Sequence, residues 1–417
     1  MKKEFITRFI GIPHHEVENI SFFNSAWKET SLDREVCYVV IHLKRVAGVY
    51  RCPCGLEYSS YYDVRRQYVR DLNWGPWREV YLEIPRYRIN CRRCGIKTEE
   101  LDSVVRNCTY TRRLADAVGY ACNEVRSIKA VAESFNLSWD TVKRIDSNRL
   151  SKELNEPDFS GVKYIAVDEF AVRKGHEYAT VFLDIESGRV LWICKGRTQE
   201  AVENVFRNVF GEDVCKRILA VAMDCWSPYE SAVKNCLPNA EIVWDMFHII
   251  KNHNKDVIEK VRKQEMRNKL GKASSEEIKK SRFLVVKNPK NLREDEPAKL
   301  RQLLKINRNL CKVYIMADVL KKLWRYKYRK CARKWFMGWY DRAVNSRITP
   351  LKSFAKKLAK RIDGIIAHCN YPINTSILEG VNNKIKVIKR IAYGFRDEEY
   401  FFLKIRKHFS EIPNYPL

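Results

Sequence analysis

Apolar and polar residues alternate along much of the first hundred positions. The segment VYLEIPRYRI, residues 80–89, alternates as an antiparallel strand with one exposed face does, and VCYVVIHL, residues 36–43, reads as a second strand. Between about Thr111 and Leu154 the apolar residues instead recur every three or four positions, which is the spacing of amphipathic helices. The pattern therefore predicts a β-rich N-terminal domain followed by a small helical one.

Strand patterns return after Val162. Three apolar runs come first, KYIAVDEFAV, YATVFLDIE and RVLWICKGR. A helix (QEAVENVFRNVF), a strand (ILAVAMD), a short helix from Ser227 and a strand (AEIVWDMF) follow. This order predicts a mixed sheet with helices packed on it. After His248 we expect a basic helical region to about Cys369, and one more helix from about Thr375 to Ile391.

The net charge indicates what kind of partner the protein binds. The 417 residues include 78 Lys and Arg against 51 Asp and Glu, a net charge of +27. Such an excess favours a polyanionic partner, with nucleic acid the first candidate and an anionic membrane surface the second. No apolar run approaches the ~18 residues of a membrane-spanning helix, and MKKEFITRFIGIP is too short in its apolar part for a signal peptide. We expect a cytoplasmic, nucleoid-associated protein that binds no membrane.

A turn interrupts the helical pattern of residues 126–150. Ile128, Val131 and Phe135 recur at helical spacing, residues 136–138 (Asn-Leu-Ser) supply a turn and an N-cap, and a second helix follows. The pattern indicates a helix-turn-helix whose second helix enters the DNA major groove, although a plain helical hairpin has the same features. The residues expected on or beside the exposed face of the second helix are Trp139, Asp140, Lys143, Arg144, Asn148 and Arg149.

Four of the 14 cysteines form a pattern. Cys52-Pro-Cys54-Gly and Cys91-Arg-Arg-Cys94-Gly read as two metal-binding knuckles, each followed by a turn glycine. Cys-x-x-Cys is the usual zinc spacing and Cys-x-Cys is not, so the first knuckle is the weaker match. We predict one structural zinc ion at these four residues. The alternative is two reduced cysteine pairs in a small β domain.

Carboxylates occur at unusual places in the strand pattern. Asp168 and Glu169 lie inside the apolar run YIAVDEFAV, Asp224 ends ILAVAMD, and Glu379 lies on the last predicted helix. Burying a carboxylate is costly unless a partner or a metal compensates it. Three carboxylates from two strands and a helix would suit two hard cations, Mg²⁺ or Mn²⁺. Alternatively, each acid is a capping or ion-paired structural residue.

Two basic segments extend the nucleic-acid interpretation. Asn382, Asn383, Lys386, Lys389 and Arg390 share one helical face with Glu379, which suits a metal beside a phosphate backbone, or a solvated face. Residues 321–342 interleave nine Lys and Arg with seven aromatic residues. Those aromatic side chains either stack on bases or belong to the protein core.

Together these segments resemble a DDE transposase of the bacterial insertion-sequence group called the ISL-three family. The resemblance covers nearly the whole chain. It rests on CPCG…RDLNWG…CRRCG, VDEFAVRKGHEYATVFLDIESGRVL, AVAMDCWSPYESAVKNCLPNAEIVWDMFHIIK, SRFLVVKNPKNL and NTSILEGVNNKIKVIKRIAYGF. Family members usually have Cys-x-x-Cys in the first knuckle, so Cys52-Pro-Cys54 is a departure.

The resemblance implies a multidomain α/β protein with a ribonuclease-H-like catalytic domain. Its expected parts are a zinc-binding domain (1–108), a helix-turn-helix domain (109–160), the first part of the catalytic domain (161–250), a basic helical insertion (251–370) and the C-terminal part of the catalytic domain (371–417).

Carried over by motif, the three catalytic acids and ligands of two Mg²⁺ (or Mn²⁺) ions are Asp168 in VDEF, Asp224 in AMDCW and Glu379 in LEGVNN. Asp245 competes for the second role, but Asp224 follows the strand where this fold places that acid. The expected supporting residues are Glu169, Asp245, His248, Asn382 and Lys386. The expected DNA contacts are Trp139, Lys143, Arg144, Asn148, Lys389 and Arg390.

The resulting expectation is a transposase that binds the terminal inverted repeats of its element and catalyses metal-dependent strand cleavage and transfer. Its partners would be double-stranded DNA, both repeats and target, and further copies of itself on DNA. The alternatives are a catalytically silent helix-turn-helix regulator, another ribonuclease-H-fold nuclease such as a junction resolvase, and a membrane-surface protein.

Overall fold

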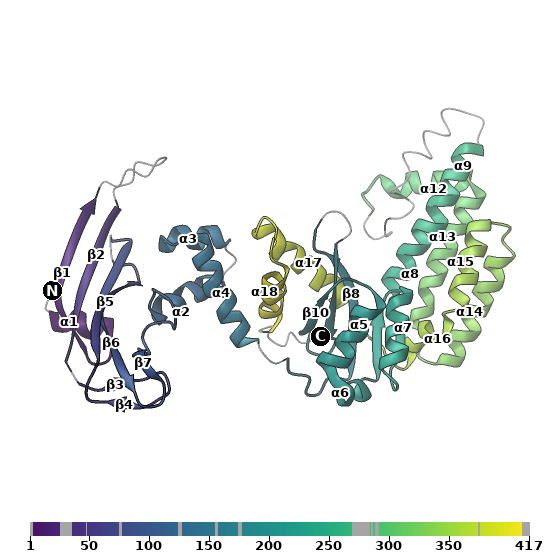
Figure 1. The fold of residues 1–417 in the computed structure, drawn as a ribbon. Coiled ribbons are helices and arrows are strands. Elements are labelled where there is room, and N and C mark those ends of the chain that lie inside the picture. The colour runs from purple at the N-terminus through teal and green to yellow at the C-terminus, as the bar shows by residue number, and fades with distance from the viewer. Residues whose placement is uncertain are drawn as a thin grey trace. The chain divides into compact units, whose positions relative to one another are not determined.

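The computed structural model describes residues 3–25, 36–46, 48–74, 77–123, 127–154, 157–173, 177–268, 284, 287, 292–373 and 376–410. The chain divides into two compact units (Figure 1). One comprises Met1–Asn155 with Ile388–Lys404, and the other comprises Glu156–Val387 with Ile405–Leu417. The prediction of a multidomain α/β protein is confirmed. None of the helices in the described ranges is both long and apolar enough to span a membrane.

A five-stranded sheet forms the N-terminal part of the first unit. Helix α1 (Lys3–Ile10) precedes strands β1 (His15–Ser25), β2 (Val36–Arg45), β5 (Asp63–Asp71), β6 (Glu79–Cys91) and β7 (Gly95–Thr98). The order is β1-β2-β6-β5, with β7 also paired to β6, and only the β2–β6 pair is parallel. As the alternation predicts, Val80, Leu82 and Ile84 are buried on one face. The short hairpin β3 (Tyr50–Arg51) and β4 (Glu57–Tyr58) carries the first cysteine knuckle.

Three helices follow the sheet, α2 (Arg112–Ala121), α3 (Ile128–Phe135) and α4 (Trp139–Glu153). Ser127 caps α3, Asn136 ends it in the left-handed conformation, and Ser138 caps α4 by accepting from the Thr141 N–H. The helix–turn–helix predicted from residues 126–150 is therefore confirmed. The helices join the sheet through Arg70, whose guanidinium donates to the Phe135 carbonyl at 3.2 Å.

A second five-stranded sheet is the centre of the other unit. Its order is β10 (Val190–Lys195), β9 (Tyr178–Asp184), β8 (Tyr164–Ala171), β11 (Ala220–Met223) and β12 (Glu241–Trp244). The first three strands are antiparallel, and β8, β11 and β12 are parallel. Helices α5 (Gln199–Val205), α6 (Gly211–Arg217) and α7 (Ser227–Cys236) connect the strands, with a π-helical turn at Phe206–Phe210. The predicted strand and helix order is confirmed.

Helices follow β12 in the same unit. They are α8 (Met246–His253), a π-helical turn (Asn254–Ile258), α9 (Glu259–Asn268), α12 (Glu296–Ile306), α13 (Arg308–Lys321), a 3₁₀ turn (Lys322–Arg325), α14 (Arg329–Val344), α15 (Thr349–Ala359), α16 (Ile362–Ile366), a 3₁₀ turn (Ala367–Cys369) and α17 (Ser376–Ile391). Most of the motif SRFLVVKNPKNL (281–292) lies outside the described residues. Helix α18 (Glu398–Ser410), which the sequence pattern did not predict, is the last element.

The aromatic-rich segment 321–342 is largely part of this helical core. Phe336 and Trp339 are fully buried, and the Trp339 indole donates to the Met316 carbonyl at 3.0 Å. Trp324, Tyr326, Trp335 and Tyr340 pack against the same core, and only Tyr328 is strongly exposed. The structure thus favours the core interpretation of these aromatic side chains over base stacking.

Candidate active site

Three aspartates lie at the same level on the three parallel strands of the second sheet. In the register of β8, β11 and β12, Val167 pairs with Met223, and Met223 pairs with Trp244. The next residue along the chain is Asp168, within β8, Asp224, directly after β11, or Asp245, directly after β12. Since neighbouring strands are about 4.8 Å apart, the three aspartates form a row along the edge of the sheet at which β11 and β12 end. Strand β11, which Asp224 follows, therefore lies directly beside β8, which carries Asp168.

Asp168 connects this row to helix α17. Its side chain is buried, and its Oδ1 accepts from the Glu169 N–H at 2.8 Å. Its Oδ2 accepts from the Asn382 amide at 2.8 Å. Glu379 lies one helical turn before Asn382 and is exposed. The helix carrying the third predicted acid is therefore held against the strand carrying the first.

Asp245 uses both carboxylate oxygens for local structure. Its Oδ1 accepts from the Phe247 N–H at 2.8 Å, which caps helix α8, and its Oδ2 lies 2.7 Å from Nδ1 of His248. Asp224 is half-buried, and its Oδ1 accepts from the Trp226 N–H at 3.1 Å. This difference supports Asp245 as an orienting residue and leaves more of the Asp224 carboxylate open to a ligand.

The electrostatics of the row favour a cation. Burial is the main cause that raises the pKa of both Asp168 and Asp224, and the charge of Asp168 raises that of Asp224 further. The hydrogen bond to Asp245 is the main cause that raises the pKa of His248, and the charges of Asp168 and Asp224 add to it. In its protonated form His248 is a positive charge beside Asp168 and Asp224, and it lowers the pKa of each.

Sequence reasoning missed Arg197, which borders this site. Its Nη1 donates to Glu169 Oε1 at 3.0 Å, and its guanidinium stacks on the rings of Tyr178 and Trp226, 4.1 and 4.8 Å from their centroids. The Trp226 indole donates in turn to the Arg197 carbonyl at 3.3 Å. Only the position of Trp226, two residues after Asp224, could have signalled this cluster. Arg197 holds Glu169 next to the first acid.

The donor set of this edge suits a hard divalent cation. Carboxylate and amide oxygens are the ligands that Mg²⁺ prefers. Asn382 Oδ1 and Glu169 Oε2 are buried and have no hydrogen-bond partner among the described residues. Orphaned buried oxygens beside acids of raised pKa leave a negative potential that a cation would compensate. The residues present therefore fit the divalent metal that the acids predict.

The four predicted cysteines come together in the first unit. The sulfur atoms of Cys52, Cys54, Cys91 and Cys94 all lie within 4.8 Å of one another, and those of Cys54 and Cys91 are 3.6 Å apart. Sulfurs around a tetrahedral zinc ion with bonds of about 2.3 Å are about 3.8 Å apart, so the spacing fits zinc. In the described part of the chain, no other His, Cys, Asp or Glu group gathers three ligand atoms this closely.

Tyr58 adds a polar neighbour to the cysteines. Its hydroxyl donates to the sulfur of Cys91 at 3.2 Å, and this contact is the main cause that lowers the pKa of that thiol. A thiolate is the form that binds zinc. The close approach of the four sulfurs shows that the Cys-x-Cys spacing of the first knuckle does not prevent a compact cluster.

The predicted DNA contacts on α4 divide into two groups. Trp139, Arg144 and Asn148 are exposed, as expected. Lys143 is half-buried and pairs with Asp397 at 2.8 Å. Arg149, expected on or beside the exposed face, is half-buried and pairs with Asp146 at 2.8 Å. On α17, Lys386 and Arg390 are exposed and Lys389 is half-buried.

Comparison with known proteins agrees with this arrangement. Residues 165–405 match a family described as "Transposase", and residues 99–150 match the "Helix-turn-helix domain of transposase family ISL3". The chain belongs to transposase family ISL3, which is the ISL-three family that the motifs indicate. As a member of the ISL3 family it is a DDE-type transposase, an enzyme, with a helix-turn-helix domain, as the sequence predicts.

Two relatives of this ISL3 transposase span most of it. The chain is 40% identical over 375 residues to the transposase for insertion sequence element IS1001 of Bordetella parapertussis, covering 88% of this chain and 91% of that protein. It is 26% identical over 384 residues to the transposase for element IS1557 of Mycobacterium tuberculosis, covering 85% and 84%. The Drosophila P element transposase strand transfer complex gives a TM-score of 0.37 at 9% identity, over 72% of this chain and 92% of that one, a likeness too distant to carry an argument.

Proposed function

We propose that this transposase recognises the terminal inverted repeats of its own insertion sequence and cleaves and transfers DNA strands there. Asp168, Asp224 and Glu379 are the proposed catalytic acids. The observation that carries the proposal is the row of acids on the parallel strands, with the Asn382–Asp168 hydrogen bond attaching the Glu379 helix to it. Both relatives are named as transposases for insertion sequence elements, which supports the choice of substrate.

The proposed catalytic domain is ribonuclease-H-like, and its acids would hold two Mg²⁺ or Mn²⁺ ions. Three antiparallel strands followed by two parallel ones, with Asp168 within β8 and Asp224 directly after β11, support this assignment. When bound, such ions activate an attacking oxygen and stabilise a leaving oxygen in phosphodiester chemistry. Asn382 fixes the orientation of Asp168, Asp245 fixes that of His248, and Arg197 fixes that of Glu169. We assign Lys386, which is exposed one turn beyond Asn382, to a contact with a DNA phosphate.

We assign one structural zinc ion to Cys52, Cys54, Cys91 and Cys94. The close approach of the four sulfurs and the small hairpin β3–β4 support this assignment, since two strands and a turn bury too little apolar surface to be stable alone. Zinc would therefore hold the hairpin onto strand β6.

Helix α4 is the proposed DNA-reading helix. Trp139, Arg144 and Asn148 are exposed on it, and arginine and asparagine are side chains that read base edges in the major groove. Lys143, Lys389 and Arg390 are assigned to phosphate contacts. Because the two ends of an element must be processed together, we infer that the protein acts as a homo-oligomer on DNA.

Strand cleavage of DNA carrying the element's ends tests the catalytic assignment. In Mg²⁺, the variants Asp168→Asn, Asp224→Asn and Glu379→Gln should lose cleavage by at least about 10³-fold while binding the same DNA as tightly as wild type in EDTA. Glu177→Gln, a change in the same unit outside the acid row, should cleave normally.

The Asp245→Asn variant discriminates between the two candidates for the second acid. It should retain measurable, reduced cleavage, since Asp245 caps α8 and orients His248. An inactive Asp245→Asn beside an active Asp224→Asn would assign the second role to Asp245. A wild type that bound the ends without ever cutting them would instead indicate the silent regulator.

A further inference from the structure

The C-terminal helix packs with the helix-turn-helix. Residues 388–404 belong to the compact unit of residues 1–155, although the transposase match of residues 165–405 runs through them. At the start of α18, Tyr400 is 3% exposed and Phe401 is fully buried, with the ring of Phe395 stacked on Phe401 at 4.5 Å. The first turns of α18 therefore belong to the compact unit that contains the helix-turn-helix, and they bury their aromatic side chains there.

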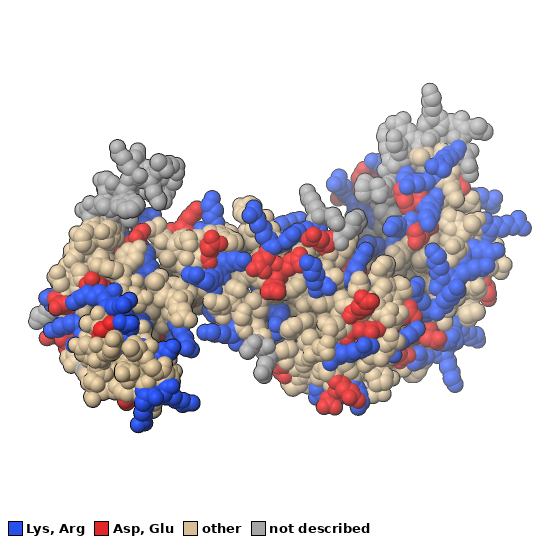
Figure 2. Space-filling model, viewed as in Figure 1, with Lys and Arg blue, Asp and Glu red and all other residues tan. Residues whose placement is uncertain are grey.

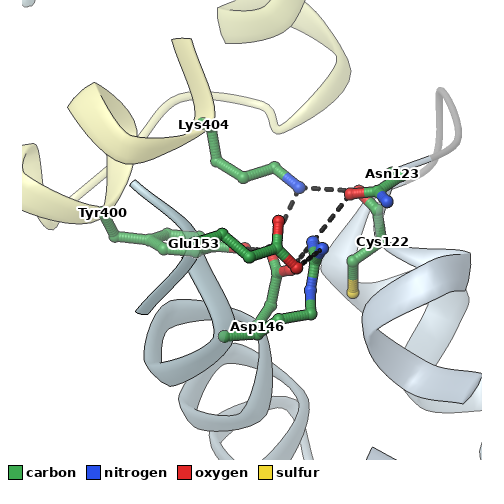
Figure 3. A network of polar contacts seen from close by, with 7 residues as sticks. Cys122, Asn123, Asp146, Glu153, Tyr400 and Lys404 are labelled. Carbon is green, nitrogen blue, oxygen red and sulfur yellow. Dashed lines mark hydrogen bonds and ion pairs between the residues drawn. The ribbon is translucent and has the colours of Figure 1, made fainter. Parts of the chain in front are cut away.

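A buried carboxylate on α4 is the centre of this contact. Asp146 is 0% exposed, and it accepts hydrogen bonds from the Tyr400 hydroxyl at 2.7 Å, from Nζ of Lys404 at 3.0 Å and from Nη2 of Arg149 at 2.8 Å (Figure 3). Two of the three donors come from α18, more than 250 positions away in the sequence.

The same network reaches the end of helix α2. Lys404 also donates to the carbonyl of Cys122, the C-cap of α2, at 2.6 Å. Arg149 also donates to Asn123 Oδ1 at 2.7 Å and to Glu153 Oε1 at 2.8 Å (Figure 3). Lys404 therefore bridges α2 and α4, and α2, α4 and α18 are joined by directional bonds.

Apolar packing alone would stabilise this interface at lower cost. Burying a carboxylate requires its full set of donors, and a hydrophobic residue of similar size needs none. A network whose donors come from separate helices is satisfied in one arrangement only, because a rotation of α4 would leave the buried Asp146 charge without Tyr400 and Lys404. The network thus determines the rotation of α4 about its own axis.

That rotation decides which side chains α4 presents to solvent. Asp140, Arg144 and Asn148 are four positions apart and exposed, so they form one stripe along the helix. Lys143, on the flank beside α18, is instead paired with Asp397 at 2.8 Å. Holding Asp146 against α18 keeps this stripe outward.

We propose that Tyr400 and Lys404 are positioning residues for DNA recognition, which fix α4 so that Arg144 and Asn148 face the bases of the terminal repeat. The proposal rests on the proposed function of α4 as the reading helix. It adds the C-terminal helix to the part of the chain that determines sequence specificity.

The test compares binding of the full-length protein to two duplexes of equal length, one carrying the terminal repeat and one unrelated, in EDTA. Tyr400→Phe and Lys404→Met should weaken binding to the repeat by roughly tenfold. Binding to the unrelated duplex should change less than about twofold, because phosphate contacts do not depend on the register of α4. The matched control Tyr393→Phe, at a 95% exposed residue, should leave both affinities unchanged.

Three outcomes are distinguishable. An unchanged ratio of the two affinities in both variants would overturn the role of α18 and leave the proposed function intact. A wild type that bound both duplexes equally would overturn end recognition itself, and this inference with it. Loss of binding to both duplexes, with a lowered melting temperature, would show that the network only stabilises the fold. If Lys404→Met fails to fold, Tyr400→Phe, which removes only one hydroxyl, still tests the proposal.

Discussion

At the scale of single residues, a buried carboxylate of the proposed active site lowers the stability of the folded protein. Burial raises the pKa of Asp168, so the folded protein binds a proton there more tightly than the unfolded chain does. Folding stability from this group therefore falls as pH rises from the unfolded pKa, about 3.9, through the folded one. In EDTA at pH 7, Asp168→Asn should raise the unfolding free energy by roughly 1–3 kcal/mol. If the Asn382 amide flips, its Oδ1, which has no hydrogen-bond partner among the described residues, can accept from the amide of the new asparagine at position 168.

Thermal unfolding with and without Mg²⁺ checks this prediction. Mg²⁺ should raise the melting temperature of wild type and leave that of Asp168→Asn nearly unchanged. Equal stabilisation of both proteins by Mg²⁺ would argue against a metal at Asp168, and a destabilised Asp168→Asn would show that the carboxylate is structural.

His248 contributes a pH dependence of its own. Its hydrogen bond to Asp245 raises its pKa, so this pair contributes stability that is complete below the unfolded value of about 6.5. That contribution disappears as pH rises through the folded pKa. In EDTA, His248→Gln should cost about 1–2 kcal/mol at pH 5.5 and much less at pH 9. Urea unfolding at the two pH values measures the difference, and an equal cost at both would refute a charged His248.

Residue-level prediction depends on what a local pattern can encode. Asp168 interrupts an apolar run and Asp224 ends one, and the parallel pairing of β8 with β11 brings these two positions to the same level of the sheet. The Asn382–Asp168 bond joins positions 214 residues apart, and Arg197 meets Glu169 from a loop beyond β10. No local pattern encodes such contacts, nor the pairing of Arg149 with Asp146.

At the scale of elements, alanine substitutions at two helical glycines should change the unfolding free energy in opposite directions. A Cβ on Gly364, in α16, would lie 2.5 Å from the Trp244 indole and 2.9 Å from the Ile242 carbonyl, so α16 approaches β12 closely only because this residue is glycine. Gly364→Ala should cost about 1–3 kcal/mol of unfolding free energy. Gly338→Ala, in α14 with open space around it, should gain up to about 1 kcal/mol. Chemical denaturation of both variants is the measurement, and a neutral Gly364→Ala would show that α16 can shift.

The elements that the sequence pattern missed depend on long-range packing. Helix α18 was not predicted, and its buried Tyr400 donates to Asp146 of α4, 254 positions earlier in the chain. The π-helical turn Phe206–Phe210 lies inside a segment that reads as one ordinary helix. Strand β2 pairs in parallel with β6, which alternation alone cannot reveal, since it specifies a buried face and not a partner.

The proposed zinc ion would join two elements, because one cysteine knuckle lies in the turn of the hairpin β3–β4 and the other begins at the last residue of β6. Removing zinc with a strong chelator, or the Cys94→Ser substitution, should lower the melting temperature of the N-terminal unit by several degrees. It should also weaken binding to the terminal repeat. Metal analysis should give one zinc per chain for wild type and none for Cys94→Ser. The Cys331→Ser control, at an exposed residue outside the cluster, should retain the ion.

At the scale of the whole molecule, the charge of +27 predicts how DNA binding responds to salt. Lys and Arg side chains are spread over the surface seen in Figure 2, with acidic residues interspersed among them. Each phosphate contact contributes a slope of about −0.9 to log K against log salt. We expect binding to unrelated DNA to weaken at least about 100-fold between 50 and 200 mM salt. Contacts from uncharged groups such as Asn148 are less sensitive, so the preference for the terminal repeat should grow with salt.

Fluorescence anisotropy of the two duplexes in EDTA, across that salt range, measures both trends at once. Asn148→Ala should reduce the preference without altering the slope, and Arg144→Ala should reduce the slope by about one for a phosphate contact. If Arg144 instead contacts a base, Arg144→Ala should lower the affinity chiefly for the terminal repeat. If affinity for unrelated DNA barely changed with salt, the excess charge would not serve DNA binding. On this proposal the net charge provides the affinity for any DNA, and the orientation of α4 provides the preference for the terminal repeat.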